Sequence, residues 1–193
     1  MKLTSRAAQR IGAVAGAIGA AILIPAVALA APGRPAHPAH PVATAVPKCT
    51  TSNLRVWVGV PGDGSAGSVQ FQLELSNISS HDCTLLGYPG VSATNVGGGQ
   101  LGSAAGRVSS HPARQIVLGP AGTAHVELAI TDVGNFSASA CHPVNAAGLK
   151  VFPPNDFTAA RIPFSFRACS RRGPVYLHVS ASIPGTGIPG FSS

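Results

Sequence analysis

The chain has 193 residues, of which 45% are hydrophobic and only 10% are charged, and its formal charge is +7. Lys2, Arg6 and Arg10 contribute three of these charges, which leaves +4 from the ten basic and six acidic residues that follow. These later basic residues are scattered and are not interleaved with aromatic residues, a pattern that argues against nucleic acid as a partner.

The first thirty residues have the features of a secretory signal. Their basic residues precede an apolar stretch over 11–30, and Ala28 and Ala30 provide the small residues of an A-x-A cleavage site. The alternative is an uncleaved membrane anchor, because the apolar stretch is nearly long enough to span a bilayer. Pro25 and the many Ala and Gly residues argue against an anchor. We therefore expect a signal peptide over 1–30, a secreted or envelope-associated protein, and no integral membrane protein after cleavage.

A segment rich in Pro and Ala follows, over residues 31–48. Such a composition cannot bury a core and favours extended conformations, so we expect a disordered linker. His37 and His40 in this segment offer only two ligands, which is too few for a convincing metal site. The sequence then predicts one domain over 49–184 and a flexible tail over 185–193, with no metal and no cofactor.

The four cysteines of the chain lie in the expected domain, at Cys49, Cys83, Cys141 and Cys169. An even number of cysteines in an exported protein predicts two disulfides rather than a reactive thiol. Three connectivities are possible. We favour Cys49–Cys83 together with Cys141–Cys169, because sequential pairing closes a short loop in each half of the domain.

Gly62, Gly64 and Gly67 have the G-x-G-x-x-G spacing of a dinucleotide-binding site. Such a site needs a helix directly after the glycines. Here Val69, Phe71, Leu73 and Leu75 instead alternate with polar residues, which indicates a half-buried strand. We interpret residues 62–67 as a flexible hairpin loop.

The same alternation of apolar and polar residues recurs along the rest of the chain. It is found over residues 124–130, 162–166 and 175–183, and shorter apolar runs lie at 83–87, 114–119 and 148–152. Segments rich in Gly and Pro separate these runs. We predict an all-β, antiparallel, immunoglobulin-like β-sandwich of about seven to nine short strands. Trp57, in the first strand at 54–60, is expected in the core near a disulfide.

Several stretches of the chain resemble a family of secreted actinobacterial domains of unknown function. The central stretch is CTLLGYPGVSATNVGGGQLG at 83–102, which matches the family pattern C-T-L-x-G-Y-P-G-V. GSVQFQLELSN, VLGPAGTAHVEL, GLKVFPPN and the late Cys169 also match, so the resemblance covers residues 49–183. The chain departs from the family at Pro120-Ala121-Gly122, where the usual Pro-Gly is lengthened. The resemblance implies export and a disulfide-bonded β fold, but no activity.

Catalytic motifs are absent from the sequence. No G-x-S-x-G nucleophile segment occurs, and several of the six acidic residues lie on polar strand faces or in turns. We therefore predict a secreted, non-enzymatic binding or interaction module at the cell envelope. Two alternatives stay open: an extracellular hydrolase with dispersed Ser, His and Asp residues, and a passive structural envelope protein.

The candidate contact surface lies within the family motif. Tyr88, Pro89 and Gly90 can simply form a sharp turn between strands. In a second interpretation, these residues and the NVGGGQ loop, with Asn95 and Gln100, contact an envelope glycan or a partner protein. Asn77 begins an N-I-S sequence but closes a strand, and we interpret it as a turn residue.

Overall fold

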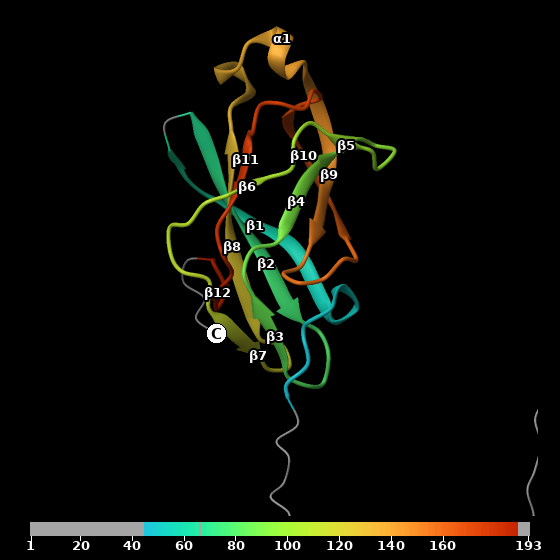
Figure 1. The fold of residues 1–193 in the computed structure, drawn as a ribbon, viewed down its shortest axis with the longest axis vertical. Coiled ribbons are helices and arrows are strands. Elements are labelled where there is room, and N and C mark those ends of the chain that lie inside the picture. The colour runs from blue at the N-terminus through green and yellow to red at the C-terminus, as the bar shows by residue number, and fades with distance from the viewer. Residues whose placement is uncertain (1–44, 66, 189–193) are drawn as a thin grey trace, which may run out of the picture. The chain divides into compact units, whose positions relative to one another are not determined.

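In the computed structural model, residues 45–65 and 67–188 are described, and they form an all-β sandwich (Figure 1). The expected signal peptide and residues 31–44 of the expected linker, including His37 and His40, lie outside the described residues. No helix in the described part of the chain is long and apolar enough to cross a bilayer.

The first sheet has the strand order β1-β2-β8-β11-β6, and β12 also pairs with β8. Its strands are β1 (Leu54–Ser65), β2 (Ser68–Asn77), β6 (Gly106–Arg107), β8 (Thr123–Thr131), β11 (Leu177–Val179) and β12 (Ile183–Pro184). All pairs are antiparallel except that of β11 with β6. The end of the chain therefore adds two short strands to the edge of β8.

The second sheet has the order β10-β9-β4-β5, and a smaller sheet pairs β3 with β7. These strands are β3 (Cys83–Leu86), β4 (Gly90–Thr94), β5 (Gln100–Leu101), β7 (Gln115–Leu118), β9 (Pro143–Phe152) and β10 (Ala160–Cys169). The helical segments are η1 (Thr51–Asn53), η2 (Val133–Asn135) and α1 (Ala138–Cys141). The predicted all-β sandwich is confirmed, and the immunoglobulin-like connectivity stays a prediction.

Strand alternation places the apolar residues in the core, as the sequence predicts. Leu73 and Leu75 of β2 have no exposed surface, and Leu149 and Val151 of β9 are buried opposite them in the second sheet. Because β2, not a helix, follows Gly67, the glycine-rich segment belongs to a hairpin, as predicted. β1 nevertheless continues to Ser65, with two register shifts, where we expected a loop from residue 62.

Tyr176 is a core residue that the periodic pattern misses. The pattern over 175–183 places Val175 inside, yet Val175 is 40% exposed and Tyr176 is fully buried. The buried Tyr176 hydroxyl donates to the carbonyl of Leu101 at 3.1 Å, which satisfies its polar atom. Burial raises the pKa of Tyr176 to about 12, so the ring stays neutral.

Trp57 lies on the outer face of the first sheet, and its expected place in the core is wrong. Its neighbours Val56 and Val58 pack against the core, while the Trp57 indole N–H approaches the Ser76 hydroxyl at 3.4 Å. The reason is the register: Trp57 is opposite Glu74, whose two neighbours in β2 point inward.

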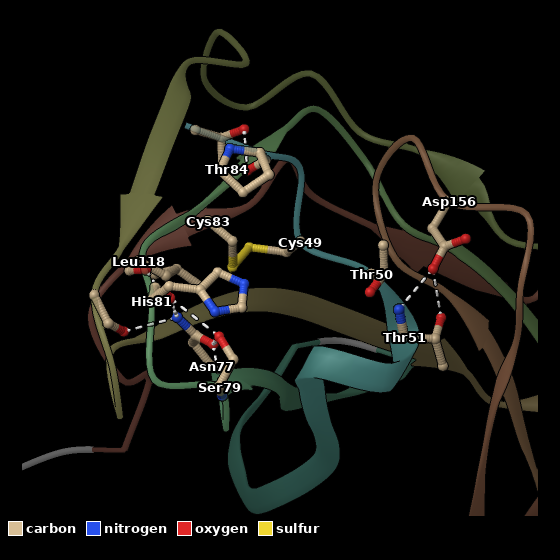
Figure 2. Close-up of a disulfide and its surroundings, with 12 residues drawn as sticks. Cys49, Thr50, Thr51, Asn77, Ser79, His81, Cys83, Thr84, Leu118 and Asp156 are labelled. Carbon is tan, nitrogen blue, oxygen red and sulfur yellow. Dashed lines mark hydrogen bonds between the residues drawn. A yellow bond between two sulfur atoms is a disulfide. The ribbon is translucent and has the colours of Figure 1, made fainter. Parts of the chain in front are cut away.

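The two disulfides join Cys49 to Cys83 and Cys141 to Cys169, as predicted. Pro47, in the last part of the expected linker, already accepts a hydrogen bond from the N–H of Thr84 at 2.8 Å. The first disulfide therefore lies where the N-terminal segment runs beside β3 (Figure 2).

Asn77 is the turn residue beside this disulfide (Figure 2). Its amide donates to the carbonyls of His81, Leu118 and Gly119 at 2.9–3.0 Å, and its oxygen accepts from the Ser79 N–H at 2.9 Å. Asn77 is only 1% exposed, so its polar side chain serves the fold and is closed to solvent.

Candidate functional site

The structure divides the expected contact surface into two parts. Tyr88 and Pro89 precede β4, and Asn95 follows it. β4 has five residues, so about 17 Å of extended chain separates the two parts at ~3.3 Å per residue. Figure 1 shows β4 running toward β5, and Tyr88 precedes the opposite end of the strand, which begins at Gly90.

The Tyr88 end is a packed corner. Pro89 is buried, and the Tyr88 hydroxyl approaches the Ser109 hydroxyl at 3.4 Å. The Arg107 guanidinium lies 5.4 Å from the centre of the Tyr88 ring. Gly90 begins β4, and a side chain there would meet Phe152 at 3.5 Å. These contacts support the turn interpretation of this segment.

The Asn95 end forms a tight turn between β4 and β5. The Gly98 N–H donates to the Asn95 carbonyl, and the Gly99 N–H donates to the Asn95 side-chain oxygen, both at 2.9 Å. Gly98 has a φ of 78°, in the region that favours glycine. Gln100 pairs with Thr94 across the turn, so Asn95 and Gln100 are together while Tyr88 is not.

A cleft of about 320 Å³ lies between this turn and β10. Its walls come from the turn, from Arg161 and Pro163 of β10, and from Thr94 of β4. Gly148 of β9 also lines the cleft, and a Cβ at this position would lie 2.5 Å from the Ile162 carbonyl oxygen. The exposed Arg161 guanidinium donates to the Gly98 carbonyl at 3.3 Å, across the cleft from β10 to the turn.

Arg161, Gly148 and Thr94 line this cleft although they were not predicted as site residues. One signal was available: a glycine inside an apolar run, such as Gly148 in GLKVF, often marks a close approach of backbones. Arg161 carried no such signal, because only the pairing of β10 with β9 and the fold of the β4–β5 turn bring it to Gly98.

Residues 185–188, here called the C-terminal strap, lie against the outer face of the first sheet. The Gly185 N–H donates to the Thr123 carbonyl at 2.8 Å, and His125 donates to the Gly185 carbonyl at 2.9 Å. We expected a flexible tail from residue 185, but Gly185, Thr186 and Gly187 are hydrogen-bonded to the sheet, and the Ile188 N–H donates to the Thr186 hydroxyl at 3.2 Å. Residues 189–193 lie outside the described residues.

Glu74 lies under the C-terminal strap and is fully buried, although its place on a polar strand face suggested exposure. One of its oxygens, Oε1, accepts from the Gly187 N–H at 2.9 Å and from the Thr186 hydroxyl at 3.3 Å. The other, Oε2, and the side-chain oxygen of Gln72 are buried without a hydrogen-bond partner. Burial raises the pKa of Glu74, although the Gly187 N–H, the charge of His125 and the Thr186 hydroxyl oppose this rise.

We compared the histidines with the dispersed Ser/His/Asp site of the hydrolase alternative. His111 has the most suggestive contacts: one ring nitrogen lies 3.0 Å from the Ser110 hydroxyl, and the other contacts the Ala181 carbonyl at 3.3 Å. A catalytic triad also needs a carboxylate that contacts the second ring nitrogen of the histidine. In His111 this nitrogen contacts a backbone carbonyl instead. Within residues 45–65 and 67–188, no group of three metal-ligating side chains comes together either.

The comparisons with known proteins give one match. The family model described as a domain of unknown function, DUF4232, matches residues 49–181. No curated protein and no solved structure matches the chain. The matched residues include both disulfides, the cleft and Glu74, and exclude the C-terminal strap.

Proposed function

We propose that this chain, which belongs to the DUF4232 family, is a non-enzymatic binding module that contacts a glycan of the cell envelope. The observation that carries this proposal is the cleft between the Asn95–Gly98 turn and Arg161. Binding residues are often found on loops that a rigid scaffold positions, and here a sheet holds the turn.

The chemistry of the cleft suits a sugar. The Asn95 amide, the Thr94 hydroxyl and the Arg161 guanidinium provide both donors and acceptors, as sugar hydroxyl groups require. A volume of about 320 Å³ is at the small end of the range for ligand sites, which fits one or two sugar rings better than a large cofactor.

The expected location of the protein outside the cytosol supports an envelope ligand. The N-terminal residues have the pattern of a secretory signal, and a linker rich in Pro and Ala precedes the domain. The two disulfides are typical of proteins that work outside the reducing cytosol.

Co-sedimentation with purified cell envelope tests the proposal, using oxidised chain 31–193 at low and high salt. We expect part of the retention to persist at high salt, because amide and main-chain contacts are not screened as ionic contacts are. In the variant Gly97→Leu a side chain enters the cleft, and we expect retention to fall about tenfold, the effect of ~1.4 kcal/mol.

Ser52→Leu is the matched control, because Ser52 is exposed in η1 and lies outside the cleft. This variant adds a similar apolar side chain and is expected to be retained like the wild type. Absence of wild-type retention, or equal retention of Gly97→Leu, would overturn the proposed site.

A further inference from the structure

The outer face of the second sheet carries two cations side by side. Arg161 of β10 is directly opposite Lys150 of β9, and Lys150 is opposite Ser92 of β4. Residues directly opposite each other in a sheet have side chains on the same face, and like charges in such a pair are destabilising. The strands β4, β5, β9 and β10 contain no Asp or Glu to offset them.

The two charged groups lean in opposite directions along the strands. The Lys150 ammonium lies over the Phe152 ring, 5.6 Å from its centre, on the side of Gly90. The Arg161 guanidinium instead contacts the Gly98 carbonyl beyond the other end of β4. Each cation thus uses a weak neutral acceptor, since a neighbouring carboxylate is missing from these strands.

We propose that the glycan ligand carries an anionic group, a phosphate or a carboxylate, which binds between Lys150 and Arg161 beside the cleft. This inference rests on the proposed function, because it specifies the ligand of the same face. The planar guanidinium can make two parallel hydrogen bonds to either group, and the ammonium adds a second charge. A bound anion would turn the repulsion between the two cations into attraction for the ligand.

Binding to three soluble polymers tests the inference: polyphosphate, polygalacturonate and neutral dextran. We expect wild-type chain 31–193 to bind at least one polyanion and not dextran. Polyphosphate alone would identify phosphate as the preferred group, and polygalacturonate alone would identify carboxylate. Binding of dextran with equal affinity would overturn the inference.

The double variant Lys150→Gln/Arg161→Gln is expected to lose at least tenfold in affinity for the bound polyanion. Removal of a like-charge pair does not threaten the fold, and circular dichroism verifies this. Arg171→Gln/Arg172→Gln is the matched control, since it removes the same charge from two exposed residues after β10. If both double variants lose the same affinity for the polyanion, binding depends only on net charge and the inference is overturned.

Envelope co-sedimentation separates this inference from the proposed function. If Lys150→Gln is retained like the wild type while Gly97→Leu is not, the binding function stands and the anionic site is wrong, because Lys150 lies outside the cleft and Gly97 lines it. If the wild type is not retained but still distinguishes polyanion from dextran through Lys150 and Arg161, the anionic site stands and the envelope role is wrong.

Discussion

The outer faces of the two sheets differ in what covers their polar side chains. On the first sheet the C-terminal strap crosses the face and gives Glu74 and His125 hydrogen-bond partners from the same chain. On the second sheet, within the described residues, Lys150 contacts an aromatic ring and Arg161 donates to one carbonyl. Because an unpaired polar group is costly only where it is buried, the second sheet can leave these cations without carboxylate partners on its outer face.

The disulfide from Cys141 to Cys169 closes one end of the second sheet, where Cys169 of β10 pairs with Pro143 of β9. Cys141 ends α1, in the connection that leaves β8, and Cys169 ends β10. We expect Cys141→Ser/Cys169→Ser to lower the free energy of unfolding by about 2–4 kcal/mol, because the unfolded chain loses a constraint. Urea denaturation measures this effect. An unchanged midpoint would show that the bridge does not contribute to stability.

Removal of the C-terminal strap is expected to have the next largest effect on the free energy of unfolding. A chain ending at Pro184 loses both donors to Glu74 and the contact with His125. We expect the free energy of unfolding to fall by about 1–2 kcal/mol, the net value of a few hydrogen bonds. A second chain ending at Ile188 isolates the strap from the residues after it. Equal stability of the two truncated chains would contradict a stabilising role for the strap.

The pH dependence of stability tests the burial of Glu74. The pKa of Glu74 is raised above 4.5 in the folded protein, so its protonated form stabilises the fold fully below about pH 4.5. This contribution is lost as the pH rises through the folded-state pKa. Glu74→Gln keeps an oxygen for the Gly187 N–H but does not ionise, so it should gain stability relative to wild type as the pH rises.

Urea denaturation at about pH 4 and about pH 7 measures this change, with the single Trp57 as the fluorescent probe. A difference that stays constant between the two pH values would show that Glu74 does not titrate on folding.

The smallest expected effect on stability concerns Lys150 and Arg161 on the outer face of the second sheet. Lys150→Glu places a carboxylate opposite Arg161, and we expect it to stabilise the fold by about 0.2–1 kcal/mol. The same variant should bind polyanions less tightly than wild type. Thermal unfolding and polymer binding measure the two effects together. A loss of stability would show that repulsion between the positive charges of Lys150 and Arg161 does not destabilise the fold.

Much of the fold follows from local sequence patterns. The period of two in residues 69–75 depends only on neighbouring residues, so the alternation identifies β2 and its inward face. The favoured disulfide pairing is also correct, because each bridge joins cysteines close in the sequence. Trp57 is the instructive error, since apolar character alone placed it inside while the register with Glu74 places it outside.

The candidate site was less accessible from the sequence. Asn95 was proposed because a glycine-rich turn is a local feature, and it lines the cleft, whereas Gln100 is not among the cleft residues. Tyr88 was joined to them only by closeness in the chain. An extended strand separates residues that are near in sequence, as β4 does here. Arg161 reaches the cleft through strand pairing, and a single sequence contains no direct sign of that pairing.

The C-terminal strap links two distant positions of the sequence. A Cβ at Gly187 would lie 2.7 Å from the side-chain oxygen of Gln72, closer than real contacts allow. Any residue larger than glycine at 187 therefore requires a smaller or displaced side chain at 72. In evolution the two positions are expected to covary, so a pairwise substitution pattern among related chains would record the strap without any structure.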